Sequence, residues 1–256
     1  MLASQRHNQI QNLLLQHGAV TISGLMETFG ISMETARRDL AAMEKAGLLA
    51  RVHGGALPLS TARFYRPLKD RMLDQQPQKQ AIAQTAAEQV NEGDYIFISS
   101  GSTALLFAQA LRKRIRKLTV VTYSLDVFET LRDLPDYTVL LTGGEYYAQE
   151  RAFRGPVAAA FLAGMYVQKV FLFPSVLSLS QGITCRTTEL VQRLTPVLRQ
   201  CNQVYVLADS SKFEQNAQHQ ITPLRQDFIF ITDKELPVAL QKTYKENHLN
   251  FIIAND

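Results

Sequence analysis

The sequence predicts an α/β protein in two parts, a small helix-turn-helix domain with a short strand followed by a Rossmann-like, mostly parallel α/β domain. Two observations support this prediction. Within residues 1–57 apolar residues recur at helical spacing, and beyond residue 77 continuous apolar runs alternate with helix-length segments. The chain has 256 residues and is 46% hydrophobic, which is enough to build two separate cores.

Three helices and a short strand are predicted in residues 1–57. Ser32 has the chemistry of an N-cap for a third helix, which runs from Met33 to about Ala46 and stops before Gly47. A strand over residues 48–52 and a turn at 53–55 follow. The apolar positions of the first two helices are Ile10, Leu13, Leu14, Ile22, Leu25, Met26 and Phe29.

The third helix has one apolar face and one polar face. At 100° per residue the apolar side chains of Met33, Ala36, Leu40 and Met43 share a face. Arg38 lies opposite that face, so the pattern favours a helix-turn-helix whose second helix presents polar residues to the DNA major groove. The alternative is an ordinary helical hairpin with solvated arginines, which the net charge of only +1 over residues 1–56 mildly favours.

Composition excludes several classes of protein. No apolar run reaches the ~18 residues of a membrane-spanning helix, and the N-terminus lacks the apolar core of a signal peptide. Two cysteines do not make a disulfide framework and the five histidines have no metal-binding spacing, so we expect a cytoplasmic protein without a metal or cofactor. The excess positive charge of +4 lies entirely within residues 1–80, where a nucleic-acid partner would bind.

A connector over residues 58–76 precedes the α/β domain of residues 77–256. Continuous apolar runs predict strands, and their alternation with helices predicts a parallel sheet covered on both faces. The expected strands are 95–99, 118–122, 137–142, 169–173, 203–208, 228–232 and 251–253. The expected helices are 77–91, 103–112, 125–132, 153–163, 187–200 and 235–247.

Polar loops follow three of these strands. Residues 99–103 (SSGST) join a strand to a helix, where a glycine, hydroxyls and helix-terminal amides form a phosphate cradle in principle. A helix cap without a ligand is an equal alternative. Residues 122–124 and 142–144 end two further strands, and ligands of open α/β sheets bind beyond such ends. Lys212 could neutralise a phosphate or be an ordinary surface lysine.

Residues 32–40 (SMETARRDL), together with Glu44 and residues 47–56, closely resemble the N-terminal signature of DeoR-family transcription regulators. These are winged helix-turn-helix proteins, so the resemblance implies a winged helix-turn-helix domain over residues 1–57. The resemblance implies that Thr35, Arg37 and Arg38 contact DNA from the recognition helix, with Arg51 and His53 approaching it from the wing. Ala36 departs from the larger apolar residue that is usual there. The DNA-binding candidates are Ser32, Glu34, Thr35, Arg37, Arg38, Arg51 and His53.

Residues 77–235 resemble the effector domain of the same family, which is related in fold to sugar-phosphate isomerases and senses phosphorylated sugars. Three departures affect the sugar half of the implied site: Ser99-Ser100 in place of an aspartate, Tyr123 in place of an asparagine, and no acid in residues 173–182. The candidate effector-binding residues are Ser99, Ser100, Gly101, Ser102, Thr103, Tyr123, Ser124, Gly143, Gly144, Gly182 and Lys212.

These observations predict a DNA-binding repressor of a carbohydrate operon, controlled by a phosphorylated sugar. We expect a homo-oligomer, dimer or tetramer, because one small winged helix reads too few base pairs for a specific site. An isomerase-like enzyme is the first alternative, with Glu145, Glu150 and Glu189 as conceivable bases, although no catalytic residue is assigned. An architectural DNA binder without an effector is the second.

Overall fold

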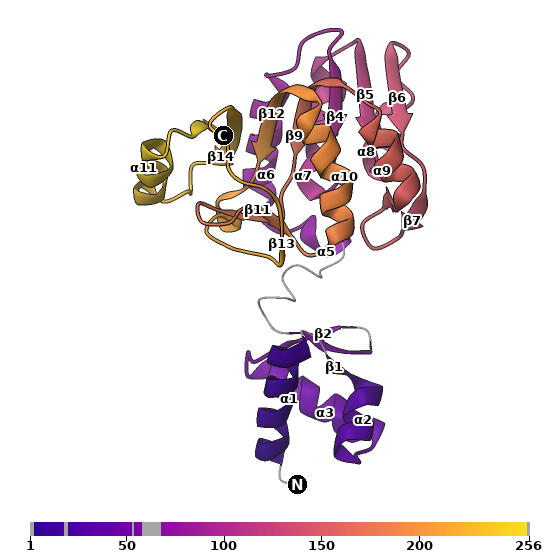
Figure 1. Cartoon of the computed structure of the whole chain (residues 1–256), viewed down its shortest axis with the longest axis vertical. Helices are drawn as coiled ribbons and strands as arrows, with labels where there is room; N and C mark the ends of the chain where they lie inside the picture. The colour runs from indigo at the N-terminus through magenta and orange to yellow at the C-terminus, as the bar shows by residue number, and fades with distance from the viewer. Residues whose placement is uncertain (1–2, 18–19, 53, 58–67, 255–256) are drawn as a thin grey trace. The chain divides into compact units, whose positions relative to one another are not determined.

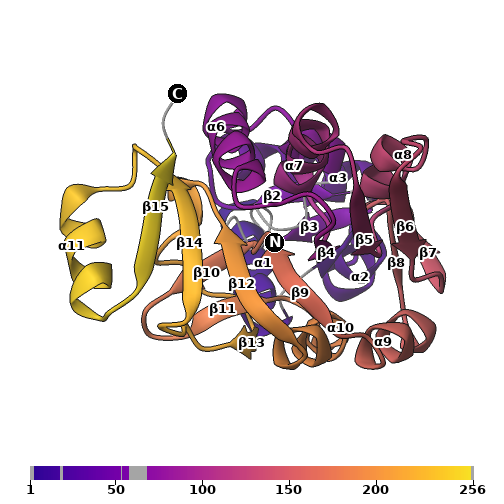
Figure 2. The same ribbon diagram turned by 90° about the horizontal axis from the view of Figure 1, so that it is seen from above.

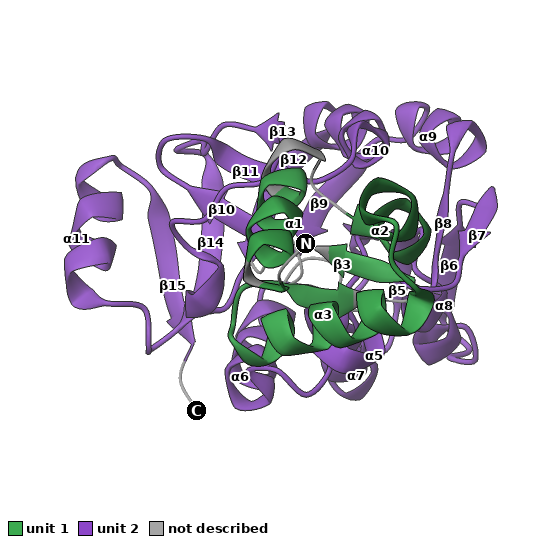
Figure 3. Ribbon diagram, turned by 90° about the horizontal axis from the view of Figure 1, so that it is seen from below, with its two compact units in different colours: residues 1–66 green, residues 67–256 purple. Residues whose placement is uncertain are grey.

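The structure is a computed structural model that describes residues 3–17, 20–52, 54–57 and 68–254 (Figure 1). The chain divides into two compact units, residues 1–66 and 67–256, which are coloured separately in Figure 3. Part of the expected connector, residues 58–67, lies outside the described residues. Its later part includes a short helix, α5 (Leu68–Arg71), that belongs to the second unit.

The first unit combines three helices with a small antiparallel sheet. The helices are α1 (Ala3–His17), α2 (Ile22–Phe29) and α3 (Met33–Lys45). The sheet has the order β1-β3-β2, formed by Val20–Thr21, Gly55–Leu57 and Ala50–Val52 respectively. The strands β1 and β3 were not predicted, because segments of two or three residues are too short to show a period. The core residues are Ile10, Leu14, Val20, Leu25, Ala36, Leu40, Met43, Leu49 and Ala56.

The turn between α2 and α3 is set by two caps and a glycine. Gly30 follows α2 with a left-handed φ of 63° and donates its N–H to Met26 O at 2.9 Å. The hydroxyl of Ser32 then accepts the N–H of Thr35 at 3.2 Å, which confirms the predicted N-cap of α3. Gly30 therefore lets the chain reverse, and Ser32 starts the next helix two residues later.

The second unit is built on a seven-stranded parallel sheet with the order β15-β14-β12-β9-β4-β5-β6 (Figure 2). Every predicted strand is present in this sheet. The bounds are β4 (Tyr95–Ile98), β5 (Leu118–Thr122), β6 (Tyr137–Leu141), β9 (Val167–Leu172), β12 (Cys201–Leu207), β14 (Phe228–Asp233) and β15 (Asn250–Ala254).

Helices cover both faces of this sheet. On one face α6 (Gln76–Ala87), α7 (Ser102–Arg114) and α8 (Leu125–Leu131) pack against Ile96, Ile98 and Phe171. On the other face α9 (Pro156–Ala163) and α10 (Thr188–Arg199) pack against Phe97, Val121 and Val170. Burial of alternate side chains on both faces explains the continuous apolar runs of these strands. The remaining helix, α11 (Val238–Glu246), buries Tyr244 against Phe251 of the edge strand β15.

Short strands outside the main sheet correct some sequence expectations. The helix expected over residues 153–163 begins at Pro156, because β8 (Ala152–Arg154) pairs with β7 (Glu145–Tyr147). A second small sheet is formed by β10 (Val176–Ser178), β11 (Gly182–Cys185) and β13 (His219–Thr222). A single turn of 3₁₀ helix, η1 (Ser210–Lys212), follows β12.

The strand order reverses direction between β4 and β9. From β4 the chain proceeds outward through β5 and β6, and it then returns to β9 and continues outward through β12, β14 and β15. In open α/β sheets, ligands bind beyond the carboxyl ends of the strands at such a reversal. Of the helices in the described part of the chain, not one has the length and apolar character needed to cross a membrane.

Candidate DNA-binding and effector sites

The predicted recognition residues lie on α3, mostly in solvent. Glu34, Arg37 and Arg38 are exposed, whereas Thr35 is half-buried. The hydroxyl of Thr35 lies 2.9 Å from that of Ser32, so both hydroxyls already take part in the cap. The guanidinium groups of Arg37 and Arg38 therefore remain the strongest groups that α3 offers to a base or a phosphate.

Met33 departs from the sequence prediction. Its side chain was expected on the apolar face, but it is 47% exposed, while Ala36, Leu40 and Met43 are buried as predicted. Side chains of a helix lean toward its N-terminus, so a side chain at the first helical position extends beyond the helix end rather than over a preceding turn. The spacing of apolar residues along the sequence therefore does not predict the exposure of a side chain at the end of a helix.

Asp39, the residue after the two arginines, is buried and ties α3 to α1. Arg6 donates to its carboxylate from Nε at 2.5 Å and from Nη2 at 2.9 Å, and His7 Nε2 lies 3.2 Å from Oδ1. Burial alone would raise the pKa of Asp39, but the hydrogen bonds from Arg6 and His7 hold it below its usual value. Sequence analysis missed this contact because Arg6 and Asp39 are 33 residues apart.

The wing strand β2 carries one of the two predicted wing residues, Arg51. Its side chain is exposed, its backbone N–H donates to Glu44 Oε1 at 2.8 Å, and its Nε lies 3.8 Å from Glu44 Oε2. Glu44 of α3 therefore anchors the start of the wing. His53, the other predicted residue, lies outside the described residues.

In the second unit, the loop after β4 reaches the N-terminus of α7 at the carboxyl edge of the sheet. Ser99, Ser102 and Thr103 are buried, and Ser99 Oγ accepts the N–H of Phe173 at 3.3 Å, which links the ends of β4 and β9. Gly101 precedes α7 with φ 135°, and within the described residues no side chain caps the helix there. The first amides of α7 are thus available to an anion.

Lys79, a residue that sequence analysis missed, is buried in the first turn of α6. The side chain is 2% exposed, and Nζ donates to Arg71 O of α5 at 2.6 Å. Burial lowers the pKa of Lys79 to about 8, while the nearby charge of Asp209 raises it in part and that of Lys212 lowers it further. The fold therefore brings together two lysines that are far apart in sequence.

The loop after β12 is fixed by two carboxylates. Asp209 is 1% exposed and accepts the N–H and the hydroxyl of Ser211, and Asp233 Oδ2 accepts the N–H of Ser210 at 2.6 Å. Lys212 closes this 3₁₀ turn and is half-buried. Nearby on β14, the hydroxyl of Thr232 is buried without a hydrogen-bond partner in the described part of the chain.

The predicted residues after β5 are both used by the fold. Tyr123 is 2% exposed, packs 5.8 Å from Phe97 between ring centroids, and is covered by the Arg193 guanidinium at 3.9 Å. The ring therefore belongs to the core on the α9–α10 face. Ser124 caps α8 by accepting the N–H of Val127 at 3.4 Å.

The other three predicted glycines, apart from Gly101, differ in how closely the surrounding backbone approaches them. Gly143, Gly144 and Gly182 all have positive φ, of 69°, 108° and 70°. A Cβ on Gly144 would lie 2.6 Å from Arg154 O, and one on Gly182 would lie 2.3 Å from Thr222 O, whereas nothing lies within 4 Å at Gly143. Close backbone approach thus explains two of these glycines without a ligand.

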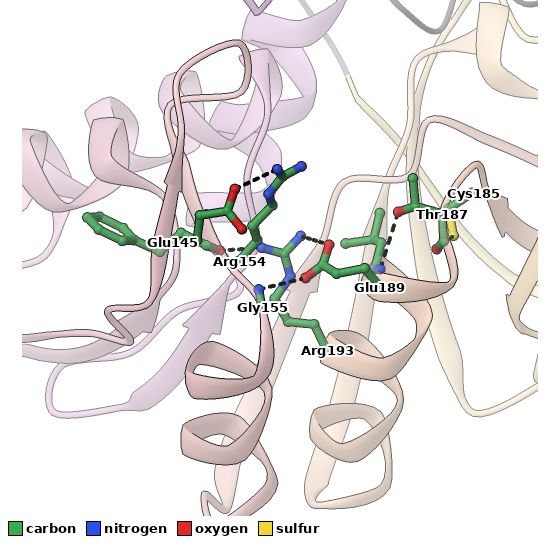
Figure 4. Close-up of polar contacts among 9 residues, drawn as sticks. Glu145, Arg154, Gly155, Cys185, Thr187, Glu189 and Arg193 are labelled. Carbon is green, nitrogen blue, oxygen red and sulfur yellow. Dashed lines mark hydrogen bonds and ion pairs between the residues drawn. The ribbon is translucent and has the colours of Figure 1, made fainter.

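A cluster of ion pairs lies where the N-termini of α9 and α10 meet (Figure 4). Glu189 Oε1 accepts the N–H of Gly155 at 3.3 Å, and its Oε2 lies 3.5 Å from Arg193 Nη2. Arg193 also donates to Phe153 O. Glu145 pairs with Arg154 at 2.7 Å, and Glu150 pairs with Arg71.

All three carboxylates considered as isomerase bases are therefore held by arginines. A general base must reach a substrate proton directly or through one water molecule. In this structure Glu145, Glu150 and Glu189 instead accept hydrogen bonds from arginine side chains. These hydrogen bonds to arginines weigh against a role of the three glutamates as general bases in proton transfer.

Comparison with known proteins agrees with the two units. A model of the DeoR-like helix-turn-helix domain matches residues 6–62, and a model of the DeoR C-terminal sensor domain matches residues 74–234. Among solved structures, ribose 5-phosphate isomerase A from Neisseria gonorrhoeae is similar with a TM-score of 0.39 and 20% identity, over 53% of this chain and 52% of that chain.

Three curated relatives match over nearly their whole length. The transcriptional repressor AccR of Agrobacterium fabrum is 31% identical over 98% of this chain and 97% of its own. The regulator GolR of Listeria innocua is 30% identical over 99% and 100%, and the glycerol-3-phosphate regulon repressor of Escherichia coli is 30% identical over 97% and 98%. These relatives are named as regulators and not as enzymes, which confirms the predicted class. The chain belongs to the DeoR family of transcriptional regulators.

Proposed function

We propose that this chain represses a carbohydrate operon and that a phosphorylated sugar bound at the carboxyl edge of the sheet controls its binding to DNA. The buried amine of Lys79 is the observation that supports the effector site most directly. A buried cation is costly unless anions compensate it, and Asp209 compensates Lys79 only in part, because burial and the nearby Lys212 still lower the pKa of Lys79 to about 8. A phosphate group is the anion that such a pair of lysines fits.

The phosphate would bind between this lysine pair and the loop after β4. Lys79 donates to Arg71 O of α5, and α5 contacts α7, whose uncapped N-terminus follows Gly101. Ser99, Ser100, Ser102 and Thr103 would supply hydroxyls, and the first amides of α7 would supply backbone donors. The site has the chemistry of a phosphate cradle with added positive charge.

The sugar half of the effector would meet a different surface from the one usual in the family. Tyr123 is buried beneath Arg193, and Ser124 is engaged as a helix cap. Gly143, Gly144 and Gly182 offer backbone groups in turns rather than side chains. We therefore propose a phosphorylated ligand whose hydroxyl groups bind to backbone groups of the protein rather than to carboxylate side chains. The name of the glycerol-3-phosphate regulon repressor supports a small phosphorylated metabolite.

In this proposal α3 contacts the bases of the DNA, and the wing contacts the DNA backbone. Arg37 and Arg38 can donate hydrogen bonds to guanine or to phosphate, and Glu34 can accept one from the amino group of cytosine. Thr35 can contact more than one kind of base. Ser32 would act through the cap that it forms, and Arg51 through the DNA backbone. His53 remains a prediction. Two copies of the chain would bind two half-sites, because one module buries too little surface for high affinity.

Fluorescence anisotropy of the full-length protein on the DNA upstream of its own gene tests this proposal. We expect specific binding that weakens with salt and is altered by one member of a panel of sugar phosphates. Arg38→Ala should weaken operator binding, whereas Lys113→Ala in the exposed end of α7 should not. Lys79→Met should remove the response to the sugar phosphate while operator binding persists.

Two results would contradict the proposal in different ways. Binding that is equally strong on unrelated DNA would contradict the operator-reading role of α3. Specific binding that no phosphorylated sugar alters, accompanied by no heat of binding in calorimetry, would contradict the effector site and favour an architectural role.

A further inference from the structure

Met33 is an apolar side chain in solvent at the start of the helix that enters DNA. It is 47% exposed, and in the described part of the first unit only Leu48, at 43%, is a similarly exposed large apolar residue. The rest of the apolar face of α3 is buried. Packing in the first unit therefore does not account for a methionine at this position.

The surroundings of Met33 are polar and suited to DNA. Arg37 lies one turn further along the same side of α3 and is exposed, as is the neighbouring Glu34. The hydroxyl of Thr35 is engaged by Ser32 at 2.9 Å. The first turn of α3 thus offers one flexible apolar side chain beside a cation, at the helix end that meets base edges in a helix-turn-helix.

The major groove contains one apolar group for such a side chain to meet. Adenine, guanine and cytosine present hydrogen-bond donors and acceptors there, and thymine adds its 5-methyl group. Methionine has no strong donor or acceptor, but its unbranched thioether adapts well to an irregular apolar surface. A contact with thymine would remove both apolar groups from water.

We propose that Met33 packs against the 5-methyl group of a thymine and makes one position of the operator specific for that base. This inference rests on the proposed role of α3 in reading DNA. The apolar pattern of α3 predicted only that Met33 would pack in the core, whereas this inference makes it a residue that recognises a base. The recognition would depend on the 5-methyl group of one thymine.

Replacement of thymine by uracil tests the inference, because the two bases differ in the major groove only by that methyl group. A duplex is first selected from a randomised pool with the full-length protein, and each thymine is then replaced singly by deoxyuridine. At one position per half-site we expect the dissociation constant to rise about fourfold, the effect of one buried methyl group. The Met33→Ala variant should bind both duplexes equally at that position.

Two variants control for indirect effects. Met33→Leu keeps an apolar side chain of similar volume and should retain most of the discrimination between thymine and uracil. Leu48→Ala removes a second large apolar side chain that is exposed in the described part of the first unit, and it should leave the discrimination unchanged. Because Met33 is exposed, thermal melting of Met33→Ala should match that of the unmodified protein.

The possible results separate this inference from the proposed function. Enrichment of no duplex would overturn the proposed DNA reading and this inference with it. Specific binding that no uracil replacement weakens would overturn the inference alone. Discrimination that persists in Met33→Ala would also overturn it, because another residue would then contact the methyl group.

Discussion

Three consecutive residues of α3 divide between the exposed surface and the core. Arg37 and Arg38 are exposed, whereas Asp39 is 4% exposed and forms a two-pronged ion pair with Arg6. The pairing fixes the rotation of α3 about its own axis relative to α1, since a guanidinium fork fits a carboxylate in one plane. The direction in which the two arginines point therefore depends on a neighbouring residue that is itself buried.

Asp39→Asn should destabilise the first unit and weaken operator binding. The change removes the negative charge of Asp39 that faces the buried guanidinium of Arg6, and removal of one member of a buried pair costs about 3 kcal/mol. Urea unfolding followed by circular dichroism measures this loss. The control is Asp133→Asn, which breaks the exposed pair with Arg112 and should change stability little. Equal effects of both variants would contradict a special role for Asp39.

Effector binding should depend on pH through Lys79. Burial lowers the pKa of this lysine to about 8, and a bound phosphate would favour the charged ammonium and raise that pKa. Binding near pH 8 should therefore take up protons, and affinity should fall as the pH rises above about 8. Calorimetry in buffers of different ionisation enthalpy measures the proton uptake.

A matched pair of variants assigns this proton uptake to one residue. Lys79→Met should abolish the uptake, while Lys113→Met, on the exposed end of α7, should preserve it. Uptake that survives in Lys79→Met would mean that a different group titrates on binding.

At the scale of elements, turns with positive φ position the loops of the second unit. Gly101 lets α7 begin directly at the sheet edge, and Gly182 brings β11 against β13. The two glycines have different surroundings, because a Cβ on Gly101 would meet only Phe173 Cβ at 4.0 Å, while one on Gly182 would collide with the backbone of Thr222 and Pro223. The backbone at Gly101 is thus open to the proposed ligand, whereas Gly182 allows the close pairing of β11 with β13.

Alanine substitutions should separate structural from ligand-related glycines. Gly182→Ala places a Cβ 2.3 Å from Thr222 O. This collision should lower the free energy of unfolding of the second unit by more than the backbone cost of a non-glycine residue at positive φ. Gly143→Ala meets no neighbour and should cost only that φ term, about 1 kcal/mol. Chemical unfolding of both variants gives the comparison, and a smaller loss for Gly182→Ala would be inconsistent with the close backbone contact.

At the scale of the whole molecule, the chain joins a DNA-binding unit to a sensor unit. A ligand changes operator affinity only if it binds one state of the full chain better than the other. By linkage, the same factor then applies to the effect of operator DNA on ligand affinity. The proposed regulation is therefore testable without knowledge of the conformational change.

The effector and the operator should weaken or strengthen each other by equal factors. Anisotropy measures the operator dissociation constant with and without saturating effector, and calorimetry measures the effector dissociation constant with and without operator DNA. We expect the two ratios to agree within error at fixed salt and protein concentration. A clear inequality would indicate that another equilibrium, such as a change of oligomeric state, is linked to binding.

Local periodicity by itself determined much of this protein. Every strand of the main sheet was predicted, since strands buried on both faces are continuously apolar, and α3 was predicted from its N-cap Ser32 and its stripe of Ala36, Leu40 and Met43. The motifs around the recognition helix indicated the family. Each of these signals is contained within a few consecutive residues.

Tertiary structure decided the features that depend on distant partners. The burial of Asp39 requires Arg6, and the lowered pKa of Lys79 requires a fold that buries its amine and brings Lys212 near it. The small sheet of β10, β11 and β13 is built from strands that are too short to show a period in the sequence. Met33 lies at a helix end, where periodicity no longer reports burial. Sequence patterns encode which face of an element is apolar, but the charges and surfaces that meet it are set by packing between elements.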